Sequence, residues 1–277
     1  GYESQGIHLE RTNSIIPNVT FLNGKIAVDA KNGKAITMLV QNYCNLTLTD
    51  MVIDGSNLSN AYYKTSSGGL VLGPNYTLSN NSKDGAKTLI QNTEIIARSG
   101  ENNVAFDSDK TSHVTVAGSS IIRGKFEVGK NASLVIIGGT FSTKPDDRYI
   151  AAGYTAKKLE GDKYQVVALF DGGTGTAEDP FLIATSEQFK AIDQLNGAPY
   201  CFKQTADIVV AAGDEVTKFA GVYDGGNQKL SSARTSGNFA SFFNFNDKTK
   251  LPGHATFKNI NVTMGELATS LLFIADW

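Results

Sequence analysis

The sequence predicts an all-β protein, a right-handed parallel β-helix (solenoid) in which three short strands make each coil. The 277 residues contain short apolar runs broken by Gly, Asn and Asp, and these runs lack a helical period. One pattern also recurs along the chain: an apolar residue, any residue, then Gly, Asn or Asp, two more residues and another apolar residue. Only 19% of the residues are charged, which suits many strands joined by tight turns.

The recurring pattern predicts sharp bends between strands, because Gly, Asn and Asp tolerate the left-handed backbone that such a bend needs. The predicted bends are Asn23, Asp50, Asn92, Gly118, Gly138 and Asn259. The first and second bends, the third and fourth, and the fourth and fifth are each separated by a length typical of one solenoid coil. The longer interval from Asp50 to Asn92 indicates two irregular coils. A β-sandwich is the alternative, but it favours two-residue turns and antiparallel alternation.

The last coil of the first block is expected at residues 124–141. Its corners are predicted at Gly129-Lys130-Asn131 and at Gly138-Gly139. The side chains expected to point inward are Val128, Leu134, Ile136 and Phe141.

Two β-helical blocks, stacked or in tandem, are predicted at residues 1–143 and 169–277. Residues 144–168 are richer in charge and indicate a strand pair, roughly 154–158 and 163–168, that covers the end of the first block or links it to the second. A short capping helix is expected at 185–196 in the second block, with Thr185 as N-cap and Gln188 as its capping-box partner.

The second block resembles the opening of β-helical repeat domains in large bacterial surface proteins. The resemblance rests on "GTAEDPFLIATSEQF", "TADIVV" and "FAGVYDGGNQKL", and its most specific part is the turn from Gly221 to Asn227. Residues 138–166 are similar to the ends of solenoid blocks in surface proteins of gut bacteria. Membership of these pectate-lyase-like or adhesin-type proteins implies a secreted, extracellular or surface-anchored protein. It also implies that the chain is a fragment accompanied by other domains, and that Asp224 caps a corner.

Composition limits the classes of partner. A net charge of −2 and a pI of about 6.0 provide no attraction for nucleic acid or an anionic membrane. The chain has no apolar run long enough to predict membrane insertion. Cys44 and Cys201 are expected to be small buried hydrophobes without a disulfide. We expect no cofactor and no metal, since the three histidines share no ligand spacing, these being His8, His113 and His254.

Catalysis is not predicted. A lyase of this fold needs carboxylates for Ca²⁺ and a basic residue, and a hydrolase needs two or three carboxyl groups around the scissile bond. The densest candidate is "FDSDKTSH", with Asp107 and Asp109, which we interpret as a solvated turn. "KPDDRY" at residues 144–149 has the same interpretation.

Binding is the predicted function. The insertion at residues 56–69 carries Tyr62 and Tyr63, which either are exposed for a ligand or pack on the neighbouring coil. The expected binding residues are Tyr62, Tyr63, Asp107 and Asp109. We expect an adhesin-like surface solenoid that binds host protein or glycan. The alternatives are a polysaccharide lyase or glycoside hydrolase, its accessory carbohydrate-binding domain, and a structural spacer.

Two further patterns are interpreted as structural. The alternating phenylalanines are expected to stack in the core, and they are Phe239, Phe242, Phe243 and Phe245. Seven Asn-x-Ser/Thr triplets are ascribed to corner chemistry instead of glycosylation, and they begin at Asn18, Asn45, Asn57, Asn75, Asn80, Asn131 and Asn261.

Overall fold

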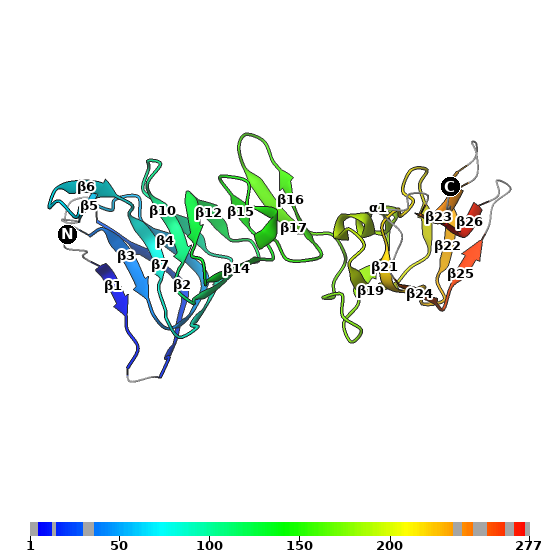
Figure 1. Cartoon of the computed structure of the whole chain (residues 1–277), viewed down its shortest axis with the longest axis horizontal. Helices are drawn as coiled ribbons and strands as arrows, with labels where there is room; N and C mark the ends of the chain where they lie inside the picture. Colours follow the sequence, from blue (N-terminus) through cyan, green and yellow to red (C-terminus); the bar gives the residue numbers. More distant parts are fainter. Residues whose placement is uncertain are drawn as a thin grey trace. The chain divides into compact units, whose positions relative to one another are not determined.

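The computed structural model describes residues 5–12, 15–29, 36–234, 240–245, 254–263 and 269–274. Strands dominate it, so the all-β class is confirmed (Figure 1). The chain divides into two compact units: the first contains Gly1–Ala151 and Thr155–Val167, and the second Ala152–Tyr154 and Ala168–Trp277. Most of the predicted cover or linker segment therefore belongs to the first unit.

A parallel sheet of five strands forms one face of the first unit. Its order is β1-β3-β7-β10-β13, and every neighbouring pair is parallel. The strands are β1 (Gln5–Leu9), β3 (Met38–Asn42), β7 (Tyr76–Asn80), β10 (Val104–Ser108) and β13 (Lys125–Val128). Figure 1 shows β3, β7 and β10 side by side.

The second sheet of this unit contains the intervening strands. They are β2 (Asn18–Ala27), β4 (Asn45–Asp54), β8 (Lys87–Gln91), β9 (Glu94–Ile96), β11 (His113–Ala117), β12 (Ile121–Arg123), β14 (Ser133–Ile136), β15 (Thr140–Phe141), β16 (Tyr154–Lys158) and β17 (Tyr164–Ala168). The chain thus passes repeatedly from one sheet to the other. This second sheet is mixed, since β15 and β17 pair antiparallel.

The predicted bends align with one another across the second sheet. β2 pairs with β4, and β4 pairs with β8 and β9, in a register that places Asn23, Asp50 and Asn92 in one row. These three residues and Asn259 have φ between 49° and 54°, and Gly118 has φ 61°. The prediction is therefore confirmed at five bends. It is wrong at the remaining one, Gly138, because the left-handed backbone is found at Gly139 (φ 100°) instead.

Between Asp50 and Asn92 the chain contributes no additional strand to either sheet beyond β7 and β8, because β3 pairs directly with β7 and β4 with β8, so the prediction of two irregular coils is wrong. The extra residues form an antiparallel hairpin, β5 (Ala61–Lys64) with β6 (Leu70–Gly73), which pairs with no other described strand. Because the hairpin branches out between β4 and β7, β3 and β7 still pair directly with each other.

Rows of side chains fill the space between the sheets. One row runs Val40, Leu78, Phe106 and Phe126, and the ring centroids of the last two lie 5.3 Å apart in a stacked arrangement. Of the side chains predicted to face inward in the last coil, Leu134, Ile136 and Phe141 are buried and Val128 is half-buried. Polar side chains are buried too: Asn42 donates from Nδ2 to Oδ1 of Asn80 on the neighbouring strand.

A strand pair and a short turn of helix complete the first unit. The strands expected at 154–158 and 163–168 are present as β16 and β17, and β17 extends the sheet beside β15. The 3₁₀ turn η1 (Asp147–Tyr149) follows an exposed Asp146, whose carboxylate accepts from the Arg148 N–H at 3.0 Å. The solvated turn predicted for residues 144–149 is confirmed.

The second unit repeats parallel pairing in three small sheets around an aromatic core. The first sheet contains β18 (Phe181–Ile183), β19 (Pro199–Gln204), β21 (Ala220–Asp224) and β24 (Ala255–Lys258). The second contains β20 (Ile208–Val210), β22 (Lys229–Ser232) and β25 (Asn261–Thr263). The third pairs β23 (Ala240–Phe245) with β26 (Thr269–Ile274). Phe242 and Phe243 lie in this core, as predicted. Phe239 and the side chain of Phe245 fall outside the described residues.

The predicted helix is present as α1 (Ser186–Ala191) followed by the 3₁₀ turn η2 (Ile192–Leu195). Its capping box is formed as expected, because Thr185 Oγ1 accepts from the Gln188 N–H and the Gln188 side chain accepts from the Thr185 N–H. Phe189 on this helix is fully buried in the aromatic core. Asp224 accepts from the Gly226 N–H, which confirms it as a corner cap.

Candidate functional site

Two adjoining hollows on the first unit form one groove, the candidate site. The larger has a volume of about 550 Å³ and the smaller about 260 Å³. Both are lined by Tyr76, Asp107 and Asp109, so they meet over β7 and β10. The five-stranded parallel sheet therefore holds the groove, and three of the four predicted binding residues line it: Tyr63, Asp107 and Asp109.

The groove floor is a row of polar side chains, one from each of four strands of this sheet. Gln41 on β3 pairs with Ser79 on β7, and Asp107 on β10 pairs with Glu127 on β13. The hydroxyl of Ser79 donates to Oδ2 of Asp107 at 3.0 Å, which joins the two pairs. Neighbouring strands lie about 4.8 Å apart, so the row presents a new polar group at each such step.

Asp107 is not in a solvated turn, as the sequence predicted, but on a strand, where it is 7% exposed. Its Oδ1 accepts from the backbone N–H of Asn80 at 2.6 Å, and its bonds go to the neighbouring strand instead of the local turn. Burial raises the pKa of Asp107 to about 7. The charges of Asp109 and Glu127 act in the same direction, and the bonds from Asn80 and Ser79 in the other.

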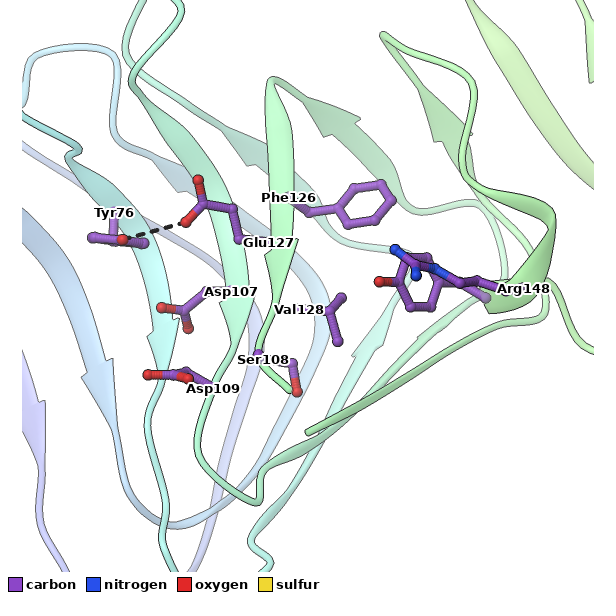
Figure 2. Close-up of a pocket in the computed structure, with 10 residues that line it drawn as sticks. Tyr76, Asp107, Ser108, Asp109, Phe126, Glu127, Val128 and Arg148 are labelled. Atoms are coloured by element: carbon purple, nitrogen blue, oxygen red, sulfur yellow. Dashed lines mark hydrogen bonds between the residues drawn. The ribbon is translucent and has the colours of Figure 1, made fainter. Parts of the chain in front are cut away.

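The other two carboxylates of the groove are held by neighbouring cations. Asp109 lies 3.4 Å from Lys110 Nζ, and Glu127 lies 2.8 Å from Lys125 Nζ. Figure 2 shows Asp107, Asp109 and Glu127 pointing the same way from β10 and β13, with the Tyr76 hydroxyl directed at Glu127. This hydroxyl donates at 3.4 Å. Burial, followed by the charge of Glu127, holds the pKa of Tyr76 well above its ordinary value.

The larger hollow continues around the edge strand β13. Phe126 and Val128 point away from the carboxylates, toward η1 (Figure 2). Arg148 and Tyr149 of η1 line this side, and the Arg148 guanidinium lies 4.6 Å from the Tyr149 ring centroid. The acidic side and the basic, aromatic side of the hollow are thus separated by β13.

The two tyrosines of the hairpin have different surroundings. Tyr63 lines the smaller hollow, packs against Gly73 and donates from its hydroxyl to the Pro74 carbonyl at 3.2 Å. Tyr62 is 50% exposed and lines neither of these hollows. Beside it, β6 exposes Leu70, Val71 and Leu72. Of the alternatives left open by the sequence, exposure applies to Tyr62. Tyr63 packs on its own hairpin instead of on a neighbouring coil, and it also lines the groove.

Several groove residues were not among the predicted site residues, namely Tyr76, Glu127, Arg148 and Tyr149. The spacing of the predicted bends could have identified Glu127 from the sequence. Adding the interval between the bends Gly118 and Gly138 to the position of Asp107 gives Glu127, its observed partner. The position of η1 beside β13 carries no comparable signal in the sequence.

Other predicted features can now be placed. Within the described ranges, no cluster of three His, Cys, Asp or Glu side chains is arranged to hold a metal ion. Cys44 and Cys201 are both free thiols, and only Cys44 is fully buried. Two of the triplet asparagines, Asn75 and Asn80, are 2% and 1% exposed, which agrees with a structural role. No helix among the described residues has the length and apolar character needed to cross a membrane.

Comparisons with protein-family models, with curated proteins and with solved structures found no match to this chain. The suggested kinship with bacterial surface proteins therefore stays a prediction.

Proposed function

We propose that the first unit is a right-handed parallel β-helix whose groove binds a glycan without processing it. Support for the β-helix comes from the chain's repeated passage between two sheets with parallel pairing, and from the row of left-handed bends. The same pairing in the second unit supports a second β-helical block. We also propose, from the resemblance above, a secreted or surface-anchored bacterial protein of the adhesin type.

The groove is the observation that carries the binding proposal. Sugar rings offer hydroxyl groups at their edges and apolar C–H groups on their faces. The floor supplies amide, hydroxyl and carboxylate groups from Gln41, Ser79 and Asp107, and Tyr63 and Tyr76 supply aromatic surface. This combination suits a glycan better than an apolar ligand.

The test compares two neighbouring residues of one strand. Tyr63→Ala removes an aromatic wall of the groove, and Tyr62→Ala makes the same change outside it. On a glycan array followed by calorimetry, we expect Tyr63→Ala to lose about tenfold in affinity, as removal of one aromatic contact does. Tyr62→Ala should bind like the wild type.

The same measurements separate binding from the role of a spacer. Circular dichroism and melting temperature establish that both variants remain folded. A folded wild-type protein that binds no glycan, or a Tyr63→Ala variant that binds unchanged, would contradict the proposal. The spacer alternative predicts the first of these two results.

Hydrolysis of a glycan is the second candidate, and Asp107 is the reason to consider it. A carboxyl group with a pKa of about 7 beside other carboxylates has the properties of a general acid. Against this, both oxygens of Asp107 already accept hydrogen bonds from Ser79 and Asn80. We expect no reducing ends from a glycan panel. Product that disappears in Asp107→Asn or Asp109→Asn would establish the enzyme instead.

A further inference from the structure

The charge of the groove narrows the class of glycan. Among the described residues that line the smaller hollow, two are acidic, Asp107 and Asp109, and none is Lys or Arg. The larger hollow adds Glu127, while its single cation, Arg148, lies on the other side of β13 and pairs with Asp146. A ligand on the sheet face therefore meets carboxylates without a lining cation.

The nearby lysines do not cancel this charge. Lys110 and Lys125 pair with Asp109 and Glu127 from outside the two hollows, and their side chains are 48% and 41% exposed. Ion pairs this exposed contribute little and exchange readily, because water screens them and long side chains lose entropy in forming them. A ligand amine can therefore take the place of either lysine without leaving a buried charge behind.

The shape of the groove favours a linear ligand that crosses the strands. The smaller hollow includes Met38 and Gln41 on β3, and on the same face of the sheet the larger hollow reaches Glu127 on β13 before it continues around that strand. The Gln41, Ser79, Asp107 and Glu127 row follows this direction, with uncharged groups at one end and carboxylates at the other. A chain of sugars meets polar groups along its length and carboxylates at the β10 and β13 end.

Building on the proposed glycan binding, we propose that the groove takes linear oligosaccharides that carry free amino groups, and that it discriminates against sugars that carry carboxylates. Ammonium groups of the ligand bond to the carboxylate of Asp109 or of Glu127, with the neighbouring sugar rings on Tyr76 and Tyr63. A uronic acid at the same place puts like charges together in a partly dehydrated groove, which is unfavourable.

Three matched ligands test this proposal on the full chain: a glucosamine oligomer, its N-acetylated counterpart of equal length, and an oligogalacturonide. At mildly acidic pH, where the sugar amines are protonated, and at low salt, we expect calorimetry to show the amine form binding about five- to tenfold tighter than the N-acetyl form. The oligogalacturonide should bind weakest. Added salt should reduce the preference, because it screens the carboxylates.

Charge-removing variants locate the effect. Asp109→Asn combined with Glu127→Gln should bring the two glucosamine ligands within about twofold of each other. Asp162→Asn, which removes one charge from the exposed turn between β16 and β17, should leave the preference as it is. A preference that survives the double substitution would overturn the assignment to these carboxylates.

The outcomes separate this inference from the proposed function. An oligogalacturonide that binds as tightly as the amine form would overturn the inference and leave glycan binding intact. If none of the three ligands binds while the glycan array shows another glycan bound, the inference is overturned and glycan binding stands, whereas an array without any bound glycan overturns both. Equal affinity for tri-lysine would also overturn the inference, because the tyrosines would then contribute nothing and the groove would be selecting charge alone.

Discussion

Asp107 places a carboxyl group in a buried position that the unfolded chain would expose to water. Its pKa is about 7 in the folded protein and about 4 in an unfolded chain. Between these values the folded state holds a proton that the unfolded state has released, so stability falls as the pH rises from about 4 to about 7. Below this range the carboxyl group is protonated in both states, and the cost of ionising it in the folded protein is absent.

Asp107→Asn should remove this dependence. The amide is isosteric, can accept from the Asn80 N–H and can donate to the Ser79 hydroxyl, so both contacts survive. Urea titrations from acidic to mildly alkaline pH should show a wild-type stability that declines relative to the variant, by up to about 4 kcal/mol. A constant difference across this range would show that Asp107 does not titrate there.

The sequence could predict the positions of the groove carboxyl groups but not the burial of Asp107. Asp107 and Asp109 stand out as a pair of carboxyl groups in a polar stretch, and the spacing of the bends would also have pointed to Glu127. The burial of Asp107 could not be read in the same way. It depends on Ser79 and Asn80, which are distant in the sequence and meet it only when the strands pair.

Among the local elements, the turn from Gly221 to Asn227 shows why glycine is required there. Gly221 has φ 92°, and a Cβ at this position would overlap the Tyr200 carbonyl oxygen on the neighbouring strand β19. Gly213 has a similar φ of 95°, but a Cβ added there would meet no other part of the chain within 4 Å. Replacing either glycine by a residue with a Cβ therefore strains the backbone. Only at Gly221 does the Cβ also clash with a neighbouring strand.

This difference predicts unequal costs for the same substitution. Gly213→Ala should lower the free energy of unfolding by about 1–2 kcal/mol, which is the usual cost of a left-handed backbone for a residue with a Cβ. Gly221→Ala should lower the free energy of unfolding clearly more, because β19 and β21 must also move apart. Chemical denaturation of both variants measures the difference. Equal losses would mean that the neighbouring strand gives way without cost.

The hairpin of β5 and β6 shows where pattern reasoning failed at the level of elements. Its strands have apolar residues of the same kind as the coil strands, for example Leu70 and Leu72, so the pattern alone treated them as further coils. Their pairing distinguishes them, because β6 pairs antiparallel with β5. The strand before the hairpin, β4, pairs directly with β8, which follows the hairpin in the sequence. The capped helix α1, by contrast, was predictable because its signal is local.

At the scale of the whole molecule, the all-β class and the bends were predictable because they depend on short patterns. A Gly, Asn or Asp within the repeated pattern marks a corner in most cases, and short apolar runs mark strands. The mixed character of the second sheet was not anticipated, since it arises where β17 joins β15 in an antiparallel direction. That choice depends on which sheet edge is open at the end of the first unit, and no local pattern encodes it.

The division into two compact units predicts two unfolding events. Phe106 is buried between the sheets of the first unit, and Phe202 is buried in the aromatic core of the second. Replacing either residue by Ala should lower the free energy of unfolding of its own unit by about 3–5 kcal/mol. Because each unit has its own core, the loss should stay within that unit.

Differential scanning calorimetry of the full chain distinguishes these events. The wild type should show two transitions, with Phe106→Ala lowering the midpoint of one and Phe202→Ala lowering the other. The exposed Tyr62→Ala variant serves as a control that moves neither. If both aromatic substitutions lowered the same midpoint, or if both transitions moved together, the two units would be a single cooperative structure. The groove would then depend on the core of the second unit for its stability.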